Sequence, residues 1–203
     1  MLKRALDVCA ATVGLVVLSP LMLAIAVAVR LGSPGPIFFR QERAGLHGRP
    51  FRILKFRTMT DARLAPGRGI TVGRDPRITR VGGVLRAYKL DELPQLVNVL
   101  RGEMSLVGPR PELPSYVAYY PPAMRDLVLS VRPGITDPTS IDLRDESALL
   151  GSVPDPDRFY VEELLPRKVR AQAEYVRSQS LGGDLKLIAR TLFVLHRTDR
   201  ANA

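Results

Sequence analysis

The chain has 203 residues, 46% of them hydrophobic, which suits one folded domain with a sizeable core and excludes a disordered protein. Its single cysteine, Cys9, excludes an internal disulfide and a cysteine-based zinc site, and its two histidines, His47 and His196, argue against a site built from several histidines. The formal net charge is +10.

This charge is concentrated in one part of the chain. Residues 40–89 contain 13 Lys and Arg against 3 Asp and Glu, a difference of +10 (13 − 3), whereas the other residues balance. A focused basic region attracts phosphate groups, whether they belong to nucleic acid, lipid headgroups or nucleotide substrates. A solvated surface alone would explain scattered charge better than this concentration.

Residues 8–29 form an apolar segment of 22 residues without a charge. At about 1.5 Å per residue, a straight helix of this length could cross a bilayer core of about 30 Å. The apolar core of a cleaved signal peptide is typically shorter, and a buried helix of a soluble protein is seldom apolar all round. The segment therefore favours a membrane anchor over these two alternatives.

The sequence of the anchor favours a helix that enters one leaflet and returns. Ser19-Pro20 lies at its midpoint, where the proline removes a helix hydrogen bond and biases the preceding residue away from helical geometry. The Ser19 hydroxyl is a candidate partner for the freed backbone groups. Both flanks are basic, with Lys3 and Arg4 before the segment and Arg30 after it, and positive charge tends to stay cytoplasmic. The alternative is a kinked helix that spans the membrane.

We therefore expect residues 1–32 to form a re-entrant membrane helix broken at Ser19-Pro20, and residues 33–203 to form a small cytoplasmic domain. The expected fold class of this domain is α+β and mainly helical, with one short β-hairpin. Because strands do not alternate with helices, a doubly wound sheet is not expected.

The expected elements of the domain follow from its local patterns. Breakers at 32–36 end the anchor, and the apolar runs 37–39 and 51–57 can pair as a hairpin across 45–48. Residues 60–79, rich in Gly, Pro, Asp and Arg, predict a mobile loop. Residues 133–157 have no clear periodicity, and helices are predicted at 81–89, 93–100, 157–178 and 184–197.

The adjacent carboxylates Asp91 and Glu92 are the residues best suited to chemistry. They open a short predicted helix, in which Pro94 is tolerated in the first turn, and a helix N-terminus would hold Asp91 ionised. An ionised aspartate can act as a nucleophile, and a neighbouring carboxylate can help to bind a hard cation such as Mg²⁺. From the pair alone, an acidic helix cap is the simpler interpretation.

Several cations could bind phosphate beside this pair. Arg110 lies between Pro109 and Pro111, which hold the backbone extended and leave the guanidinium little freedom to lose. Lys55 and Arg57 share one face of the second predicted strand. A spacer and a solvated strand face explain these residues equally well when each is taken alone.

Taken together, these motifs resemble the bacterial sugar transferase family of monotopic polyprenyl-phosphate phosphoglycosyl transferases. The resemblance covers almost the whole chain, and its segment at 86–112 is long and specific. The chain is similar to the short form of the family, with a re-entrant anchor and a catalytic domain but no added multi-span domain. The motifs are Ser19-Pro20, Lys-Phe-Arg-Thr-Met at 55–59, Arg-x-x-x-Leu-Asp-Glu-Leu-Pro-Gln at 86–95, Asn-Val-Leu-Arg-Gly-Glu-Met-Ser-Leu-Val-Gly-Pro-Arg-Pro-Glu at 98–112, Arg-Pro-Gly-Ile-Thr at 132–136 and Asp-Leu-Lys at 184–186.

The resemblance implies that a sugar-1-phosphate passes from a UDP-sugar to polyprenyl (undecaprenyl) phosphate, with release of UMP. This is the first membrane step of glycoconjugate synthesis, at the cytoplasmic face of the bacterial inner membrane. The implied partners are these two substrates and one leaflet of the bilayer, without nucleic acid, and a homodimer is left open. Asp91 would attack the β-phosphate to form a covalent phosphosugar intermediate, and Glu92 would complete the dyad. Both carboxylates are candidate ligands of a required Mg²⁺. Arg86 would orient Glu92 and contact phosphate, and the other implied phosphate-binding residues are Lys55, Arg57, Arg110 and Arg144.

One segment departs from the family pattern. Many members follow Arg-Pro-Gly-Ile-Thr with Gly-Trp-Ala-Gln-Val-Asn-Gly-Arg, whereas residues 137–144 read Asp-Pro-Thr-Ser-Ile-Asp-Leu-Arg, and only Arg144 clearly matches. If this segment helps to recognise the nucleotide-sugar, the donor sugar, and even the nucleotide, cannot be carried over from the family, whereas the reaction class stands because the dyad is unchanged.

Two other functions remain as alternatives. A membrane-tethered, catalytically silent protein that binds nucleic acid or anionic lipid would explain the anchor and the charge. An ordinary glycosyltransferase would move the sugar without phosphate and release UDP.

Overall fold

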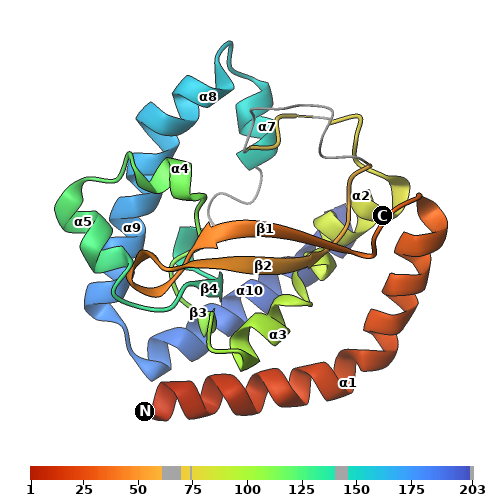
Figure 1. Cartoon of the computed structure of the whole chain (residues 1–203), viewed down its shortest axis with the longest axis horizontal. Helices are drawn as coiled ribbons and strands as arrows, with labels where there is room; N and C mark the ends of the chain where they lie inside the picture. Colours follow the sequence, from red (N-terminus) through yellow and green to blue (C-terminus); the bar gives the residue numbers. More distant parts are fainter. Residues whose placement is uncertain (61–69, 74, 140–145, 202–203) are drawn as a thin grey trace.

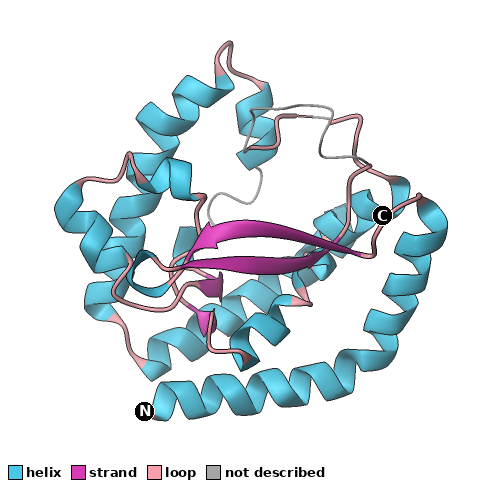
Figure 2. Cartoon of the chain, viewed as in Figure 1, coloured by secondary structure: helices cyan, strands magenta, loops and turns pink. Residues whose placement is uncertain are grey.

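The computed structural model describes residues 1–60, 70–73, 75–139 and 146–201, with side chains as far as Val194. Figure 2 shows a mainly helical molecule around a central β-hairpin, as the sequence predicts. The helices and strands are α1 (Leu2–Gly32), β1 (Phe38–Ala44), β2 (Pro50–Phe56), α2 (Arg80–Ala87), α3 (Gln95–Leu100), β3 (Ser105–Val107), α4 (Pro114–Val117), α5 (Pro122–Val128), β4 (Gly134–Thr136), α7 (Glu146–Gly151), α8 (Pro156–Phe159), α9 (Leu165–Ser178) and α10 (Leu181–Ala201).

The predicted hairpin is confirmed, and its first strand is longer than expected. β1 and β2 pair antiparallel, with Phe38 opposite Phe56 at one end and Ala44 opposite Pro50 at the other. β1 continues through the polar residues 40–43, which lack the apolar pattern that reveals a strand in sequence. In a second small sheet, β3 pairs parallel with β4. Neither described sheet has more than two strands, which agrees with the expected absence of a doubly wound sheet.

The predicted helices are found with shifted ends. The prediction for 81–89 corresponds to α2, and that for 93–100 to α3, which follows a 3₁₀ turn, η3 (Leu90–Glu92). The helix predicted at 157–178 is present, but it contains one π-helical turn (Tyr160–Leu164). This turn precedes α9, which has Pro166 near its start. Because a proline cannot donate a backbone hydrogen bond, it favours such a local change of winding.

In the two segments for which no helix is predicted, 60–79 and 133–157, the described residues form only short elements. Residues 133–157 include β4, α7 and the start of α8, and Met59 and Ile78 form an isolated bridge at the ends of the predicted loop. Residues 61–69 and 74 of that loop lie outside the described residues, so its mobility stays a prediction.

α1 passes through Pro20 without ending, and Figure 1 shows that the helix changes direction part of the way along. The expected break is therefore a bend. Pro20 has no N–H to donate to the carbonyl of Val16, one turn earlier. The Ser19 hydroxyl donates to that carbonyl at 2.8 Å, which confirms the predicted role of Ser19.

The two arms of α1, before and after Pro20, both pack against the rest of the chain. In the first arm, Ala11 packs in a buried cluster with Phe51 of β2 and Leu96 of α3. In the second arm, Ile25 and Val29 pack in another cluster with Phe56 and Leu85. Polar contacts also fix the first arm, where Lys3 pairs with Asp184 and the Asp7 carboxylate accepts from the Ser105 hydroxyl and the Leu106 N–H.

The outward face of α1 remains apolar and exposed. The helix is long and apolar enough to cross a membrane, and only 11% of its most apolar window is buried. A core helix of a soluble protein would cover this face, so the exposure agrees with membrane association. The exposed side chains are Leu2, Leu6, Val13, Val16, Val17, Leu21, Leu23, Val27 and Leu31.

Arg57 fastens the C-terminal end of α1. Its buried guanidinium donates to the carbonyls of Val29, Ser33 and Pro34 and to the Ser33 hydroxyl, at 2.7–3.2 Å. The last carbonyls of a helix lack intrahelical donors, so a cation is favourable there. Gly35 is required at this point, because it has φ +120° and a Cβ would collide with Arg57.

Candidate active site

A cavity of about 1040 Å³ lies between the hairpin, the α2–η3 segment and the region of α7 and α9. Its lining is strongly basic, with nine Lys and Arg against four Asp and Glu among the described residues, a difference of +5 (9 − 4). Such a lining favours ligands that carry several negative charges. The cations are Arg40, Arg43, Lys55, Arg57, Arg77, Arg86, Lys89, Arg110 and Lys168, and the anions are Asp91, Glu92, Glu112 and Glu146.

The dyad Asp91–Glu92 lies in η3, at the wall of this cavity. The turn follows α2 and precedes α3, whose N-cap is Pro94 and whose first turn has no acidic residue. The expectation that the two carboxylates open this helix, and that its N-terminus holds Asp91 ionised, is therefore wrong, because they lie in a separate 3₁₀ turn and burial raises the pKa of Asp91. The fully buried Asn98 attaches α3 to β2, since its side chain accepts from the Leu54 N–H at 3.0 Å and donates to the Arg52 carbonyl at 2.9 Å. This contact brings the dyad beside the strand that carries Lys55.

Two cations hold Glu92. Its Oε1 accepts from the Lys55 ammonium at 2.6 Å and from the Arg110 guanidinium at 2.8 Å. Burial alone would raise the pKa of Glu92, but the charges of Arg110 and Lys55 outweigh it and hold that pKa well below its ordinary value. Glu92 is therefore a fixed, ionised carboxylate that positions the two cations.

Asp91 has the opposite environment. It is only 8% exposed, and its Oδ1 is buried without a hydrogen-bond partner among the described residues. Burial, with the negative charge of Glu92, raises the pKa of Asp91 in spite of the opposing charges of Lys55, Lys89 and Arg86. A carboxylate that is unpartnered and more basic than usual is the better nucleophile of the two.

The same contrast decides how well Mg²⁺ would fit. Mg²⁺ is usually held by one or two carboxylates together with substrate phosphates rather than by an all-protein cage. The unpartnered oxygen of Asp91 suits such a ligand, whereas the Oε1 of Glu92 is already shared by two cations. The described residues contain no cluster of three or more metal-ligating side chains, so phosphates would have to supply the remaining oxygens.

Arg110 reaches the dyad from the segment that follows β3. A Cβ on Gly108 would collide with the Arg132 carbonyl, and a Cβ on Gly134 would collide with the backbone of Gly108. This close approach sets the path of the chain into Pro109. The buried Asp137 carboxylate accepts from the Arg110 N–H at 3.2 Å and is itself held by Thr139 and Gln172. The first residue of the segment that departs from the family pattern thus supports the backbone of Arg110.

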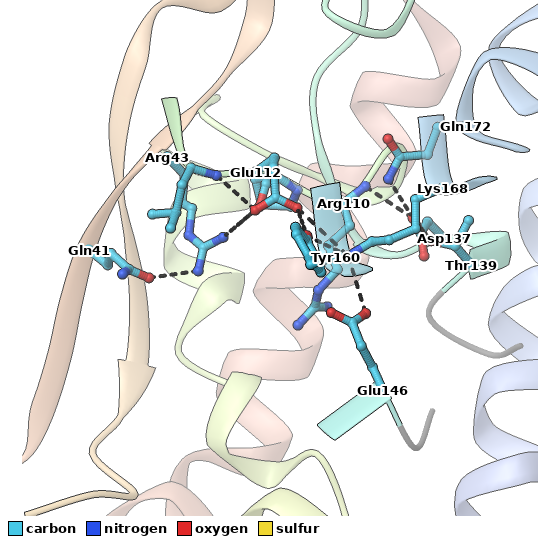
Figure 3. A network of polar contacts seen from close by, with 12 residues as sticks. Gln41, Arg43, Arg110, Glu112, Asp137, Thr139, Glu146, Tyr160, Lys168 and Gln172 are labelled. Atoms are coloured by element: carbon cyan, nitrogen blue, oxygen red, sulfur yellow. Dashed lines mark hydrogen bonds and ion pairs between the residues drawn. The ribbon is translucent and has the colours of Figure 1, made fainter. Parts of the chain in front are cut away.

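A second polar network, centred on Glu112, extends the cavity wall (Figure 3). The Glu112 carboxylate accepts from the Tyr160 hydroxyl at 2.6 Å and from Arg43 at 3.3 Å, and it lies 3.7 Å from the Lys168 ammonium. Lys168 also donates to Tyr160 and to Glu146. The network holds the segment next to Arg110 from β1, α9 and the π-helical turn.

Sequence reasoning missed most of this network, although Glu112 ends the long quoted motif. Local patterns give Arg43 no role, since it lies in a polar run of β1. Lys168 and Tyr160 lie more than 45 residues beyond Glu112 in the chain, and no local pattern links them to it. The charged run Pro-Arg-Pro-Glu was the one signal that could have directed attention to Glu112.

The predicted phosphate-binding residues do not all lie at the dyad. Lys55 and Arg110 meet at Glu92, and only one terminal nitrogen of Arg110 is engaged there, with the side chain 31% exposed. Arg86 lines the cavity and its charge acts on Asp91, while the described contacts to Glu92 come from the other two cations. Arg57 also borders the cavity but is committed to the end of α1, and Arg144 lies outside the described residues. Their binding of phosphate stays a prediction.

Comparisons with known proteins agree with the resemblance. A family model described as bacterial sugar transferase matches residues 1–198. The UDP-glucose:undecaprenyl-phosphate glucose-1-phosphate transferase of Caulobacter vibrioides is 42% identical over 98% of this chain and 71% of its own length. The Escherichia coli protein of the same name is 39% identical, over 95% of this chain and 40% of its own length. A UDP-N-acetylgalactosamine-undecaprenyl-phosphate N-acetylgalactosaminephosphotransferase of Aeromonas hydrophila is 45% identical, over 66% of this chain and 32% of its own length. The chain thus spans less than half of the last two relatives.

Proposed function

The chain belongs to the bacterial sugar transferase family, and on that premise we propose that it transfers a sugar-1-phosphate from a UDP-sugar to a polyprenyl phosphate and releases UMP. The observation that carries the proposal is the unequal pair of carboxylates in a basic cavity. The Oδ1 of Asp91 is buried without a hydrogen-bond partner in the described part of the chain, and Glu92 is held between Lys55 and Arg110. A transfer of sugar without phosphate that inverts the sugar would not need a nucleophilic carboxylate.

The proposed reaction has two displacements at one phosphorus. An Asp91 oxygen attacks the sugar-bearing β-phosphorus of the donor, and the bond from that phosphorus to the bridging oxygen breaks, so UMP leaves with the bridging oxygen. The sugar phosphate is then esterified to Asp91. A phosphate oxygen of the polyprenyl phosphate attacks the same phosphorus and the bond to Asp91 breaks. The product is a polyprenyl diphosphate sugar, and the carboxylate is restored.

The protein's cations would stabilise the charge that this chemistry moves. Arg110 and Lys55 lie on one carboxylate oxygen of Glu92, and their remaining N–H groups can bind donor phosphate oxygens. Arg86 contributes further positive charge at the cavity wall beside Asp91. Such fixed cations need little reorganisation as the charge on the phosphorus oxygens grows.

Mg²⁺ is the proposed cofactor, with Asp91 as its first protein ligand and Glu92 as a second candidate. When bound, the ion would neutralise phosphate charge and withdraw electrons from the reacting phosphorus. The unpartnered oxygen of Asp91 supports this assignment.

We propose further that α1 is a re-entrant anchor of the bacterial inner membrane, with the cavity on the cytoplasmic side. Both arms of the helix contact the same body of the protein, the first through the ion pair of Lys3 and the second through the hydrogen bonds of Arg57 to the end of α1. A straight spanning helix would hold its two ends about 45 Å apart at 1.5 Å per residue and on opposite sides of the membrane. The basic flanks also favour one common side.

The first experiment identifies the nucleotide product. Purified protein in detergent is incubated with Mg²⁺, undecaprenyl phosphate and a panel of UDP-sugars, which includes UDP-glucose and UDP-N-acetylgalactosamine because relatives are named for those donors. We expect UMP with at least one donor, and none from the Asp91→Asn variant. Release of UDP would refute phosphate transfer and favour an ordinary glycosyltransferase. Normal turnover by Asp91→Asn would refute the nucleophile.

A further inference from the structure

The chain leaves α2 through a residue in the left-handed conformation, and that residue is a lysine. The helix ends at Ala87, Tyr88 is its C-cap, and Lys89 follows with φ 56° and ψ 19°. The Lys89 N–H donates to the Arg86 carbonyl at 3.2 Å, as in a helix closed by a left-handed residue. Glycine is the usual residue at this position, because a Cβ is unfavourable there.

The choice of lysine therefore has a conformational cost. Among the described residues, positive φ is found at four glycines and at only two other residues, His47 and Lys89. His47 lies in the exposed hairpin turn, away from the cavity. Lys89 lines the cavity two residues before Asp91. A strained conformation retained beside a reactive group points to a use for the side chain.

The ammonium of Lys89 is available, unlike those of its neighbours. Lys55 and Arg110 are engaged by Glu92, whereas the described contacts give the Lys89 ammonium no hydrogen bond or ion pair. Its electrostatic neighbours are Arg110 and Lys55, which repel it, and Asp91 and Glu92, which attract it.

The local charge is also uneven. Lys55, Arg86, Lys89 and Arg110 are four cations around the two carboxylates of the dyad, which leaves a positive difference of two (4 − 2). Since Glu92 already has two cations, Lys89 is not needed to neutralise it. A lysine that only ended the helix would be better replaced by glycine.

We propose that the Lys89 ammonium binds a phosphate group of the substrate that reacts at Asp91, and that lysine is kept at the end of α2 for this contact. The proposal rests on the proposed function for the identity of the substrate. The phosphate has two sources in that reaction, the diphosphate of the donor and the phosphate of the polyprenyl acceptor. The chemistry of recognition is the same for both, an ammonium that donates to anionic oxygens.

The test uses the fact that stability favours glycine at position 89, whereas phosphate binding favours a cation. Lys89→Gly removes both the strain and the ammonium, Lys89→Asn tolerates the left-handed backbone without a charge, and Lys89→Arg keeps the charge. His47→Gly is the matched control, because it removes the same kind of strain outside the cavity. Thermal unfolding and the KM and kcat for each substrate are measured on the full chain in detergent.

We expect Lys89→Gly to unfold at or above the wild-type temperature while its kcat/KM falls at least tenfold, with Lys89→Asn similarly impaired and Lys89→Arg largely active. His47→Gly should be as stable or more so, with unchanged kinetics. A rise in the KM for the UDP-sugar assigns the contact to the donor, and a rise in the KM for polyprenyl phosphate assigns it to the acceptor. Unchanged kinetics in Lys89→Gly, or a matching loss of activity in His47→Gly, would overturn the proposal. So would a lower unfolding temperature in Lys89→Gly that accounts for its lost activity.

A binding measurement separates this proposal from the proposed function. Titration calorimetry with inorganic pyrophosphate needs no turnover, and we expect its affinity to fall at least fivefold in Lys89→Gly but not in His47→Gly. If the wild type released no UMP but this difference held, the proposed function would fail and the phosphate contact would stand. Equal pyrophosphate affinity in the wild type and Lys89→Gly would overturn the contact even if UMP were released.

Discussion

Glu92→Gln should destabilise the protein, whereas Asp91→Asn should leave its stability unchanged or raise it, although the two substitutions are nearly isosteric and adjacent. In each variant an amide replaces a buried carboxylate, so neither leaves a cavity. The difference lies in the partners, since Glu92 binds Lys55 and Arg110 and the Oδ1 of Asp91 binds no described group. The prediction therefore tests the asymmetry on which the proposed mechanism depends.

The magnitude for Glu92→Gln follows from the burial of the ion pairs. Removal of one partner of a buried pair costs about 3–5 kcal/mol. The Lys55 and Arg110 side chains are 17% and 31% exposed, so water can partly solvate the cations that remain. We therefore expect a loss of about 3 kcal/mol, at the lower end of that range. Asp91→Asn removes an unfavourable buried charge, so the free energy of unfolding should be unchanged or greater at pH 7.

The pH dependence provides an independent check. Folding lowers the pKa of Glu92 below its ordinary 4.5, so its stabilisation is present above pH 4.5 and is lost as the pH falls through the folded pKa. The deficit of Glu92→Gln should then shrink in acid. Folding raises the pKa of Asp91 above 3.8, so its ionisation reduces stability as the pH rises from about 3.8 through the folded pKa. Any gain from Asp91→Asn should disappear at low pH.

The assay is chemical unfolding in detergent, followed by circular dichroism, at pH 7 and at several values below pH 4.5. Wild type and the two variants are compared under identical conditions, and UMP release is measured in parallel. Loss of stability in Asp91→Asn equal to that in Glu92→Gln would refute the reasoning. A stable Glu92→Gln at pH 7 would show that Lys55 and Arg110 do not depend on this carboxylate.

Three further substitutions test other parts of the structure. Ser19→Ala should destabilise the protein by about 1 kcal/mol. It should have no effect in a Pro20→Ala background, because the backbone N–H of residue 20 then donates to the Val16 carbonyl. Additive losses in a double-mutant cycle would contradict this. Tyr160→Phe removes a donor from the buried Glu112 and should cost about 1–3 kcal/mol in chemical unfolding, and full stability would remove the network's structural role. Arg57→Lys cannot reach all four acceptors at the end of α1, so limited proteolysis should cleave residues 33–36 faster than in the wild type; equal rates would argue against this role of Arg57.

The elements that local chemistry defines could be predicted from the sequence. Alternation and turn residues located the hairpin, helical periodicity located α2, α3, α9 and α10, and the uncharged run located α1. The role of Ser19 was also predictable, because a missing proline N–H and a hydroxyl one residue away are both properties of the local sequence. That the helix bends at Pro20 and does not break could not be predicted, because it depends on how both arms pack against the domain.

The roles of charged residues depended on the tertiary structure. Lys55 and Arg57 are two residues apart on one predicted strand face, yet Lys55 reaches Glu92 and Arg57 fastens the end of α1. A short motif identifies which residues can ionise, so the dyad was visible in the sequence. The partners of Glu92 come from 37 residues before it and 18 residues after it in the chain. Electrostatic interactions depend on distance in space and on burial, and therefore only the fold decided that Glu92 is locked while Asp91 is left unpartnered.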